Sequence, residues 1–425
     1  NLRPGMVPAR PGASRCDAAA ASDERIGNNR SFRSVVDLLG PGWCSWRGGW
    51  GSDLRLVGAR DGSWVLEEGT RERRRFKDLL AAFRELWSSR SVRGERPWMV
   101  GWLGYEACAA LAGGLPIHSD RHDFPSGIVL IEPQPVRIPP PQPTGPAAVC
   151  DRLRWSLDAS QFEGMVAAIR DQIAAGEVYQ VNLSRRWTAE GWTGTLDPFV
   201  DASRAGGAPE YLAHFRCAEG ELVTASMELL VRRRGQDLET MPIKGTRPRG
   251  ESEGQDRELV ADLAADPKER AELAMIVDLE RNDLGRVSET GSIRVEDDGT
   301  VSTYPSIHHR VAKVTGRLRE NLEWWDVLAA VVPGGSVTGC PKHAAMSMIA
   351  NFEPVPRGPF TGALGVVTGN GEMEMALPIR SVWLTDGRLE LAAGCGIVWE
   401  SDPAAEERES RLKVARWLEM VGGGR

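Results

Sequence analysis

The chain has 425 residues, enough for one large domain or two ordinary ones, with 41% hydrophobic and 26% charged residues, as in globular proteins. Its net charge is −7 and no basic stretch alternates with aromatic residues, so we expect no nucleic-acid binding. Its apolar runs are much shorter than the roughly 20 residues that a membrane-spanning helix needs, so we expect no membrane association. Seven scattered cysteines without metal-binding spacing fit reduced thiols, and we expect a cytoplasmic location.

The composition changes along the chain and suggests an order of segments. Residues 1–30 are rich in Ala, Arg and Gly, and we expect a disordered tail there. Residues 31–150 form an expected N-terminal domain, in which Trp-rich stretches broken by glycine predict short strands and tight turns. The proline-rich run 135–146 predicts a linker, so we place a boundary near residue 150 and a second domain at 151–425.

The second domain opens with signals for one helix and one strand. Ser160 and Glu163 match a capping box, and apolar residues at helical spacing follow as far as Gly176. Residues 179–184 then alternate between apolar and polar types, which predicts a half-buried strand.

Two later helices have the same kind of start, an Asp followed by a Pro. The pair at 266–267 predicts a helix that runs toward Gly285, and the pair at 402–403 predicts one that continues to about Val421. Strand-like runs with helices between them, without strict alternation, favour an α+β fold with antiparallel sheets.

Each of these two helix starts carries a pair of glutamates, Glu269 with Glu272 and Glu406 with Glu409. Carboxylates at i and i+3 share one face of a helix and repel each other unless a cation lies between them. Four oxygen donors suit Mg²⁺. The alternative is that each pair only complements the dipole of its helix.

Three glycine-rich segments, 242–250, 333–342 and 392–397, could cradle a carboxylate or phosphate through backbone N–H groups. Hairpin turns have the same composition. None of the three matches a nucleotide-binding motif.

Taken together and in order, these segments resemble the chorismate-utilising enzymes. Residues 242–250 resemble the family motif PIxGTxPRG, residues 271–286 resemble AExxMxVDLxRNDLGR, residues 334–342 resemble GGSxTGxPK, and residues 394–403 resemble GxGIVxxSDP. The order and spacing agree over about residues 158–420. Residues 101–106 resemble the variable N-terminal domain of the family more loosely, as in the anthranilate synthase component I type.

The resemblance implies an α/β sandwich: two large antiparallel sheets packed face to face, helices outside, and an active site in the cleft between them. It also implies that Glu272 and Glu409 bind Mg²⁺ directly, with Glu269 and Glu406 behind them through water. The metal would hold the ring carboxylate of chorismate.

The resemblance further implies a set of substrate contacts. Arg380 is similar to the arginine that binds the enolpyruvyl carboxylate. Backbone and hydroxyl contacts are expected from Gly245, Thr246, Thr338, Gly394 and Gly396. Lys413 either touches the ring carboxylate or forms an ordinary i,i+4 pair with Glu409.

Two positions select a branch of the family. Members that activate water carry a lysine where this chain has Gln180, so ammonia is the expected nucleophile. Lys244 stands within PIKGT, as in the aminodeoxychorismate synthases, where anthranilate synthases have Ala. Only six of the 52 basic residues are lysine, and a lysine amine can attack carbon whereas a guanidinium cannot. The expected reaction forms 4-amino-4-deoxychorismate through a covalent Lys244 adduct.

Two further residues complete the expected catalytic set. Glu228 is similar to the glutamate of the family motif SPE, the expected general acid for the departing C4 hydroxyl, although Met227 replaces the proline. His309 matches a family histidine that assists pyruvate loss in some members, and its role here is left open.

The expected ammonia source is a separate glutaminase subunit, because the chain contains no Gly-x-Cys-x-Gly nucleophile elbow. Two alternatives remain. One is an anthranilate or aminodeoxyisochorismate synthase in which Lys244 is incidental. The other is a catalytically silent allosteric binding subunit.

Overall fold

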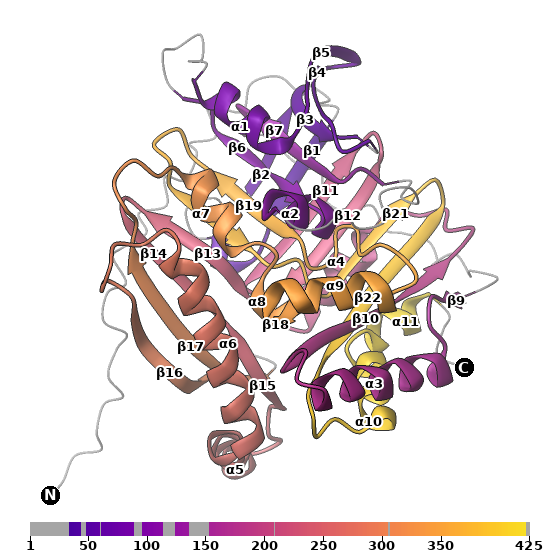
Figure 1. Ribbon diagram of the computed structural model, residues 1–425. Coiled ribbons are helices and arrows are strands. Elements are labelled where there is room, and N and C mark those ends of the chain that lie inside the picture. Colours follow the sequence, from indigo (N-terminus) through magenta and orange to yellow (C-terminus); the bar gives the residue numbers. More distant parts are fainter. Residues whose placement is uncertain are drawn as a thin grey trace, which may run out of the picture.

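The computed structural model describes residues 34–43, 48–59, 61–88, 96–113, 124–135, 153–207, 209–304 and 307–421. The expected tail and the expected boundary near residue 150 lie outside these ranges. Within them, two antiparallel sheets pack face to face with helices on the outside, so the expected α+β sandwich is confirmed (Figure 1).

The smaller sheet has ten described strands. Their order across the sheet is β18 (Gly339–Cys340), β10 (Gln180–Ala189), β22 (Arg388–Ile397), β21 (Ser381–Thr385), β12 (Gly220–Ser226), β11 (Tyr211–Cys217), β1 (Ser34–Leu38), β2 (Gly48–Ser52) and β8 (Gln134–Pro135), with β9 (Leu153–Trp155) also paired with β10.

The larger sheet has twelve described strands. Their order is β15 (Ile243–Pro248), β17 (Ile307–Arg317), β14 (Asp237–Met241), β13 (Leu229–Arg234), β20 (Met373–Ala376), β19 (Ala363–Val367), β6 (Met99–Leu103), β7 (Gly127–Ile131), β3 (Leu54–Gly58), β4 (Trp64–Glu68) and β5 (Arg71–Phe76), with β16 (Arg294–Thr303) also paired with β17.

The described helices are α1 (Leu79–Ser88), α2 (Tyr105–Leu111), α3 (Ala159–Ala174), α4 (Asp197–Ala205), α5 (Glu253–Ala265), α6 (Pro267–Gly285), α7 (Trp324–Val331), α8 (Gly335–Thr338), α9 (Lys342–Phe352), α10 (Pro403–Leu412) and α11 (Ala415–Met420), with a 3₁₀ turn at Pro41–Trp43. None of them combines the length and the apolar character that crossing a membrane requires.

The core has a central layer and three outer layers. Side chains from both sheets, among them Trp102, Phe215 and Trp383, form the central layer. Helices α1, α6 and α7 cover the larger sheet, α4 and α11 cover one part of the smaller sheet, and α3 and α9 cover the part that contains β10. This burial removes apolar surface on both faces of each sheet, which is the main stabilising contribution to such a sandwich.

Strands from before residue 135 are built into both sheets. Strand β1 pairs with β11 in the smaller sheet, and β6 pairs with β19 in the larger one. Figure 1 shows the indigo strands of this early segment continuing the sheets that later segments form.

Three local expectations need correction. The capping box of α3 is formed by Asp158 and Gln161, not by Ser160 and Glu163, because the helix begins two residues earlier. Strand β10 is buried on both faces, because helices cover one side and the facing sheet the other. The helix that begins at Pro403 ends at Leu412, and a separate short helix, α11, follows.

Candidate active site

The two acidic helices begin as their sequences predict. The Asp266 side chain accepts hydrogen bonds from the backbone N–H groups of Lys268 (3.0 Å) and Glu269 (3.2 Å), and Pro267 is the first residue of α6. At α10, Asp402 accepts from the N–H of Ala405 at 2.8 Å. The caps satisfy donors that a helix start leaves free. They also fix the turns that carry Glu269, Glu272, Glu406 and Glu409, called here the four glutamates.

The four glutamates lie close together in space. Lys268 on α6 lies 3.7 Å from the Glu272 carboxylate and interacts electrostatically with all four. Burial lowers the pKa of Lys268, but the four negative charges outweigh it and raise the pKa overall. Because one ammonium group interacts with both glutamate pairs, the first turns of α6 and α10 must lie close to each other.

Burial and mutual repulsion both raise the pKa of two of the four glutamates. Burial, followed by the charge of Glu272, raises the pKa of Glu269. Burial also raises the pKa of Glu406, with a further contribution from Glu409. A divalent cation between the pairs would remove this repulsion.

The donor set fits a hard cation. Oxygens of Glu406 and Glu409 and the sulfur of Cys395 lie within 4.8 Å of one another. Burial raises the pKa of the Cys395 thiol to about 12, so the sulfur stays protonated and is a poor ligand. The carboxylates are therefore the residues that could hold a metal, and oxygen ligands of this kind suit Mg²⁺.

A backbone bulge directs Lys244 into the site. The pairing of β15 with β17 shifts register between Lys244 and Thr246, and Gly245 between them has φ = 78°. A Cβ at position 245 would lie 2.8 Å from Leu263 and 3.1 Å from Glu269, so this turn requires glycine.

The Lys244 amine reaches across to the other sheet. A Cβ on Gly396 of β22 would lie 3.2 Å from Lys244 Nζ and 3.1 Å from Gln180 Nε2. The amine, the amide and the bare backbone of Gly396 therefore meet at one point between β15 of the larger sheet and β22 and β10 of the smaller sheet. Glycine at this position keeps the space open for a third group.

Two buried amides face this space without partners. Gln180 has no exposed surface, and neither its Oε1 nor its Nε2 forms a hydrogen bond within the described residues. Asn182 Oδ1 is likewise unpartnered, and a Cβ on Gly394 would lie 2.5 Å from it. Leaving a buried polar group unsatisfied costs about 1–3 kcal/mol. These groups fit a site that is completed by a polar ligand.

Glu228 is a buried carboxyl beside Lys244. Burial raises its pKa to about 7, against the opposing effects of the Ser336 hydroxyl, which donates to it, the Lys244 charge and the Ile243 N–H. A carboxyl with this pKa can hold and release a proton near neutral pH, as a general acid must.

His309 and Arg380 form the far corner of the site. His309 Nδ1 lies 2.9 Å from Thr246 Oγ1 and 3.4 Å from the Gly245 carbonyl, and burial followed by the charge of Arg380 lowers the pKa of the imidazole to about 4. Within the described residues no carboxylate is recorded as a partner of Arg380, whose Nη1 lies 3.6 Å from Met227 Sδ. The guanidinium is available to an anion.

These residues lie within a segment that a family pattern matches. The pattern described as chorismate binding enzyme covers residues 129–419, more than half of the chain. The chain belongs to the chorismate binding enzyme family.

Relatives with two different names are similar to this chain. An anthranilate synthase component 1 from Aeropyrum pernix is 35% identical over 339 residues, which are 79% of this chain and 77% of that protein. An aminodeoxychorismate synthase component 1 from Klebsiella aerogenes is 40% identical over 268 residues, which are 63% of this chain and 59% of that protein. The chain spans only a little more than half of several other curated relatives, such as 54% of the anthranilate synthase component 1 of Pseudomonas putida.

Solved structures of chorismate binding enzymes share the fold. Anthranilate synthase component I from Streptococcus pneumoniae has a TM-score of 0.72 at 24% identity and covers 98% of this chain and 100% of its own. The menaquinone-specific isochorismate synthase MenF from Escherichia coli has a TM-score of 0.66 at 20% identity and covers 92% of this chain and 95% of its own.

Two of the expected substrate-binding residues already have partners. The Thr338 hydroxyl is buried and donates to the Gly334 carbonyl at 2.8 Å within its own short helix. Lys413 lies 2.8 Å from the Glu409 carboxylate and donates to the Gly394 carbonyl at 2.8 Å. Lys413 therefore forms the i,i+4 pair with Glu409, and its amine also contacts the glycine-rich strand β22.

Sequence reasoning missed three contributors to the site: Ser336, Lys268 and Asn182. Ser336 lies inside the expected GGSxTG motif and Asn182 two residues after Gln180, so spacing alone could have suggested them. Lys268 stands four residues before Glu272, the spacing of a helical ion pair.

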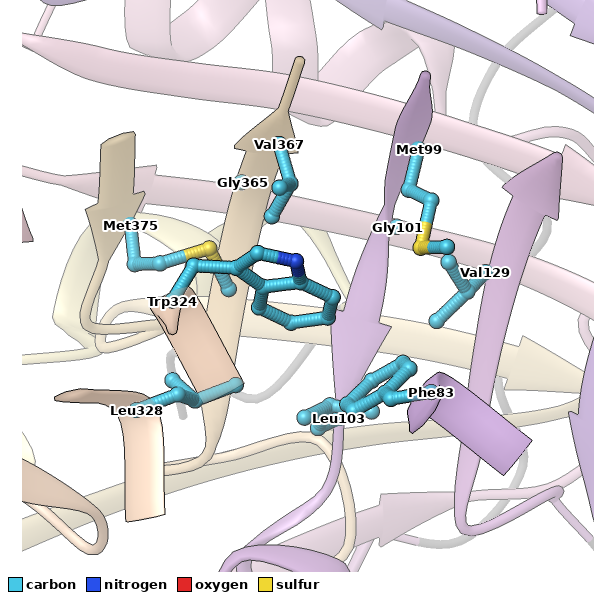
Figure 2. Close-up of a pocket in the computed structure, with 10 residues that line it drawn as sticks. All are labelled: Phe83, Met99, Gly101, Leu103, Val129, Trp324, Leu328, Gly365, Val367 and Met375. Atoms are coloured by element: carbon cyan, nitrogen blue, oxygen red, sulfur yellow. The ribbon is translucent and has the colours of Figure 1, made fainter. Parts of the chain in front are cut away.

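A second hollow in the structure is unrelated to this chemistry. It lies between α1, α7 and strands of the larger sheet, where the Trp324 indole packs among apolar side chains such as Phe83, Met99 and Met375 (Figure 2). All ten lining residues are apolar, so this hollow is a packing gap in the core and not a chorismate site.

Proposed function

We propose that the protein is an aminodeoxychorismate synthase component that converts chorismate and ammonia to 4-amino-4-deoxychorismate. The observation that supports this proposal is the position of the Lys244 amine, which lies against Gly396 and Gln180 beside the buried acid Glu228. A candidate nucleophile and a candidate general acid thus lie near each other.

The chemistry requires a neutral amine and a protonated carboxyl at the same time. Proton transfer from the Lys244 ammonium to Glu228 produces both at once, and burial of the Glu228 carboxyl favours its uncharged form. The amine then attacks C2 of chorismate while the C4 hydroxyl leaves as water with the proton from Glu228. Ammonia attacks C4, the ring double bond returns and the lysine amine is released. The net change replaces a hydroxyl by an amino group with loss of water.

The remaining residues bind and orient the substrate. We assign Arg380 to the enolpyruvyl carboxylate, and the unsatisfied amide groups of Gln180 and Asn182 to the ring substituents. A bound Mg²⁺ would hold the ring carboxylate and withdraw electron density from the ring. We infer that the four glutamates hold this ion, Glu272 and Glu409 directly.

The ammonia source is part of the proposal. Component 1 in the names of relatives indicates at least one other component, and we propose that a separate glutaminase subunit supplies ammonia. The chain alone should then use ammonium salts, better at higher pH, and should not use glutamine. Glutamine-dependent turnover by the isolated chain would contradict this partner.

The test is the substitution of Lys244. Lys244→Ala should still bind chorismate but lose formation of the 4-amino product by at least about 100-fold, the lower end of what a covalent or acid–base group contributes. Lys244→Arg should be no better, because a guanidinium stays protonated. Lys77→Ala is the control, since that side chain is 85% exposed.

Mass spectrometry separates the candidate functions. Wild type held with chorismate, Mg²⁺ and no ammonia should carry a covalent adduct on Lys244. If anthranilate is the main product in the presence of ammonia, the protein is an anthranilate synthase component, as several of its relatives are named. If isochorismate is the main product, the site activates water instead of ammonia. Wild-type rates in Lys244→Ala without any trapped adduct would overturn the covalent mechanism.

A further inference from the structure

The corner of the site at His309 contains a side chain with no part in the reaction as derived so far. Met227 lies in the connection between β12 and β13, is 8% exposed, and places its sulfur 3.3 Å from His309 Nε2 and 3.6 Å from Arg380 Nη1. The thioether therefore separates an imidazole from the guanidinium that is free to bind a substrate carboxylate.

Both ring nitrogens of His309 are engaged. A thioether sulfur can only accept a hydrogen bond, so the contact with Met227 fits a ring that carries its proton on Nε2. Nδ1 then accepts from the Thr246 hydroxyl at 2.9 Å, and this short contact decides the tautomer over the 3.4 Å approach of the Gly245 carbonyl, which would need the proton on Nδ1. The lowered pKa of about 4 agrees with a neutral ring at physiological pH. In this state His309 presents no free lone pair to the space beside Arg380.

An aminated ring can react further by losing its enolpyruvyl group. In that elimination a base removes the ring C–H proton, the C–O bond to the enolpyruvyl group breaks, and the ring becomes aromatic. The enolpyruvyl carbon takes up a proton and leaves as pyruvate, so no oxidant is needed. An imidazole next to the enolpyruvyl carboxylate is well suited to move these protons, whereas the guanidinium of Arg380 cannot accept one.

We propose that Met227 is a positioning residue that holds His309 away from this elimination, so that the product keeps its enolpyruvyl group. The inference rests on the proposed function, because it explains how the site stops at 4-amino-4-deoxychorismate. In this proposal the Met227 side chain lies between the imidazole and the substrate. It also keeps the Nε2 proton of His309 directed at the sulfur, so this proton is not transferred to the substrate.

The test supplies the enzyme with chorismate, Mg²⁺ and ammonium and measures the ratio of pyruvate released to aminated product formed. Lactate dehydrogenase quantifies the pyruvate, and mass spectrometry quantifies the aminated product. Met227→Leu keeps the volume of the side chain but removes the acceptor, and should raise this ratio about 100-fold. Met227→Gln restores an acceptor oxygen and should keep the ratio low. Adding His309→Ala to Met227→Leu should abolish the release. Met375→Leu, a buried methionine on β20, should behave as wild type.

Two outcomes would overturn the inference, and they differ in what they say of the proposed function. If wild type makes 4-amino-4-deoxychorismate and Met227→Leu releases no more pyruvate than wild type, the role of Met227 is wrong and the function stands. If the wild type itself releases one pyruvate for each aminated product, the product does not keep its enolpyruvyl group, and the proposed function is wrong.

A measurement on the folded protein does not depend on turnover. The ¹⁵N spectrum of labelled histidine should show His309 of the wild type neutral at pH 7 with its proton on Nε2, and Met227→Leu should shift that signal. A proton on Nδ1 in the wild type would also overturn the proposal, even if the variants fold poorly.

Discussion

Helices α6 and α10 begin with the same local pattern but differ in their surroundings. Each has an Asp cap, a Pro at its first position and two glutamates three residues apart. On α10, Glu406 is 6% exposed and accepts from Ser401 at 2.7 Å, whereas Glu409 is exposed and paired with Lys413. On α6, both glutamates are half-buried and Lys268 lies on the same helix. The local sequence thus sets the spacing of the carboxylates, and their neighbours set the charge of each one.

The largest effect should come from removing one of the two glutamates proposed to hold the metal directly. Glu272→Gln and Glu409→Gln should each keep the fold but lose about 100-fold or more of turnover, because a metal's stabilisation of the reacting charge is worth several kcal/mol. Turnover across a Mg²⁺ series, with circular dichroism, measures this. Glu253→Gln in the first turn of α5 is the control, since that side chain is 97% exposed. Near-normal turnover in either variant at any Mg²⁺ concentration would remove that helix from the site.

The two lysines should affect different constants, the KM for chorismate and the Mg²⁺ concentration that gives half-maximal turnover. Lys413→Met removes a donor to the Gly394 carbonyl, and should raise the KM for chorismate by about tenfold, the effect of one lost hydrogen bond to a charged group. Lys268→Met removes a positive charge that competes with a cation for Glu272, and should lower the Mg²⁺ concentration needed for half-maximal turnover. If Lys413→Met lowers the Mg²⁺ requirement as much as Lys268→Met does and leaves the KM for chorismate unchanged, the two lysines act alike, each through its glutamate partner.

A pH series should separate the two glutamates of α10. The pKa of Glu406 is raised above its ordinary value of 4.5 in the folded protein, so its ionisation weakens the fold as pH rises through and above that value. In EDTA, Glu406→Gln should therefore have a higher Tm than wild type at pH 7.5, and the difference should disappear as pH falls toward 4.

Glu409 should show the reverse behaviour, because its pKa is lowered: burial opposes the lowering, and Lys413, Lys244 and Lys268 cause it. Its stabilising effect is present above pH 4.5 and is lost as pH falls. Glu409→Gln should accordingly have a lower Tm than wild type at pH 7.5. A lower Tm for Glu406→Gln at that pH would mean that the Ser401 contact outweighs burial.

The smallest effect should come from the caps. Asp402→Ala should cost about 1 kcal/mol of folding free energy, the usual contribution of a helix cap. Asp266→Ala should cost somewhat more, because Asp266 also accepts from Arg247 at 2.9 Å. Urea unfolding measures both. A larger loss at Asp402 would reverse the expected order of the two helices.

The sequence was a good guide wherever a local pattern determines structure. Both Asp-Pro starts, the end of α6 at Gly285 and the α+β class follow from caps, proline geometry and the order of strand-like runs. Local patterns could not show that β10 is covered on both faces, because its alternation is the same whether a helix lies over it or water does.

The sequence predicted which residues lie in the candidate site better than it predicted the contacts between them. Resemblance gave Lys244, Glu228, Arg380 and the four glutamates as expected site residues. The structure brings them into one region, and their roles stay predictions. That Met227 lies between His309 and Arg380 depends on three segments far apart in sequence, and no spacing rule relates them. The single departure from the expected SPE motif was nevertheless visible as a residue type out of place.

The pairing of early strands with late ones has a consequence for biosynthesis. Strand β6 forms its hydrogen bonds to β19, so residues 99–103 must wait for residues 363–367 before that part of the sheet can close. On the ribosome most of the chain has to emerge while β6 still has an open edge, and contacts this distant in sequence form slowly. We therefore expect newly made chains to need protection from aggregation until β19 has been synthesised.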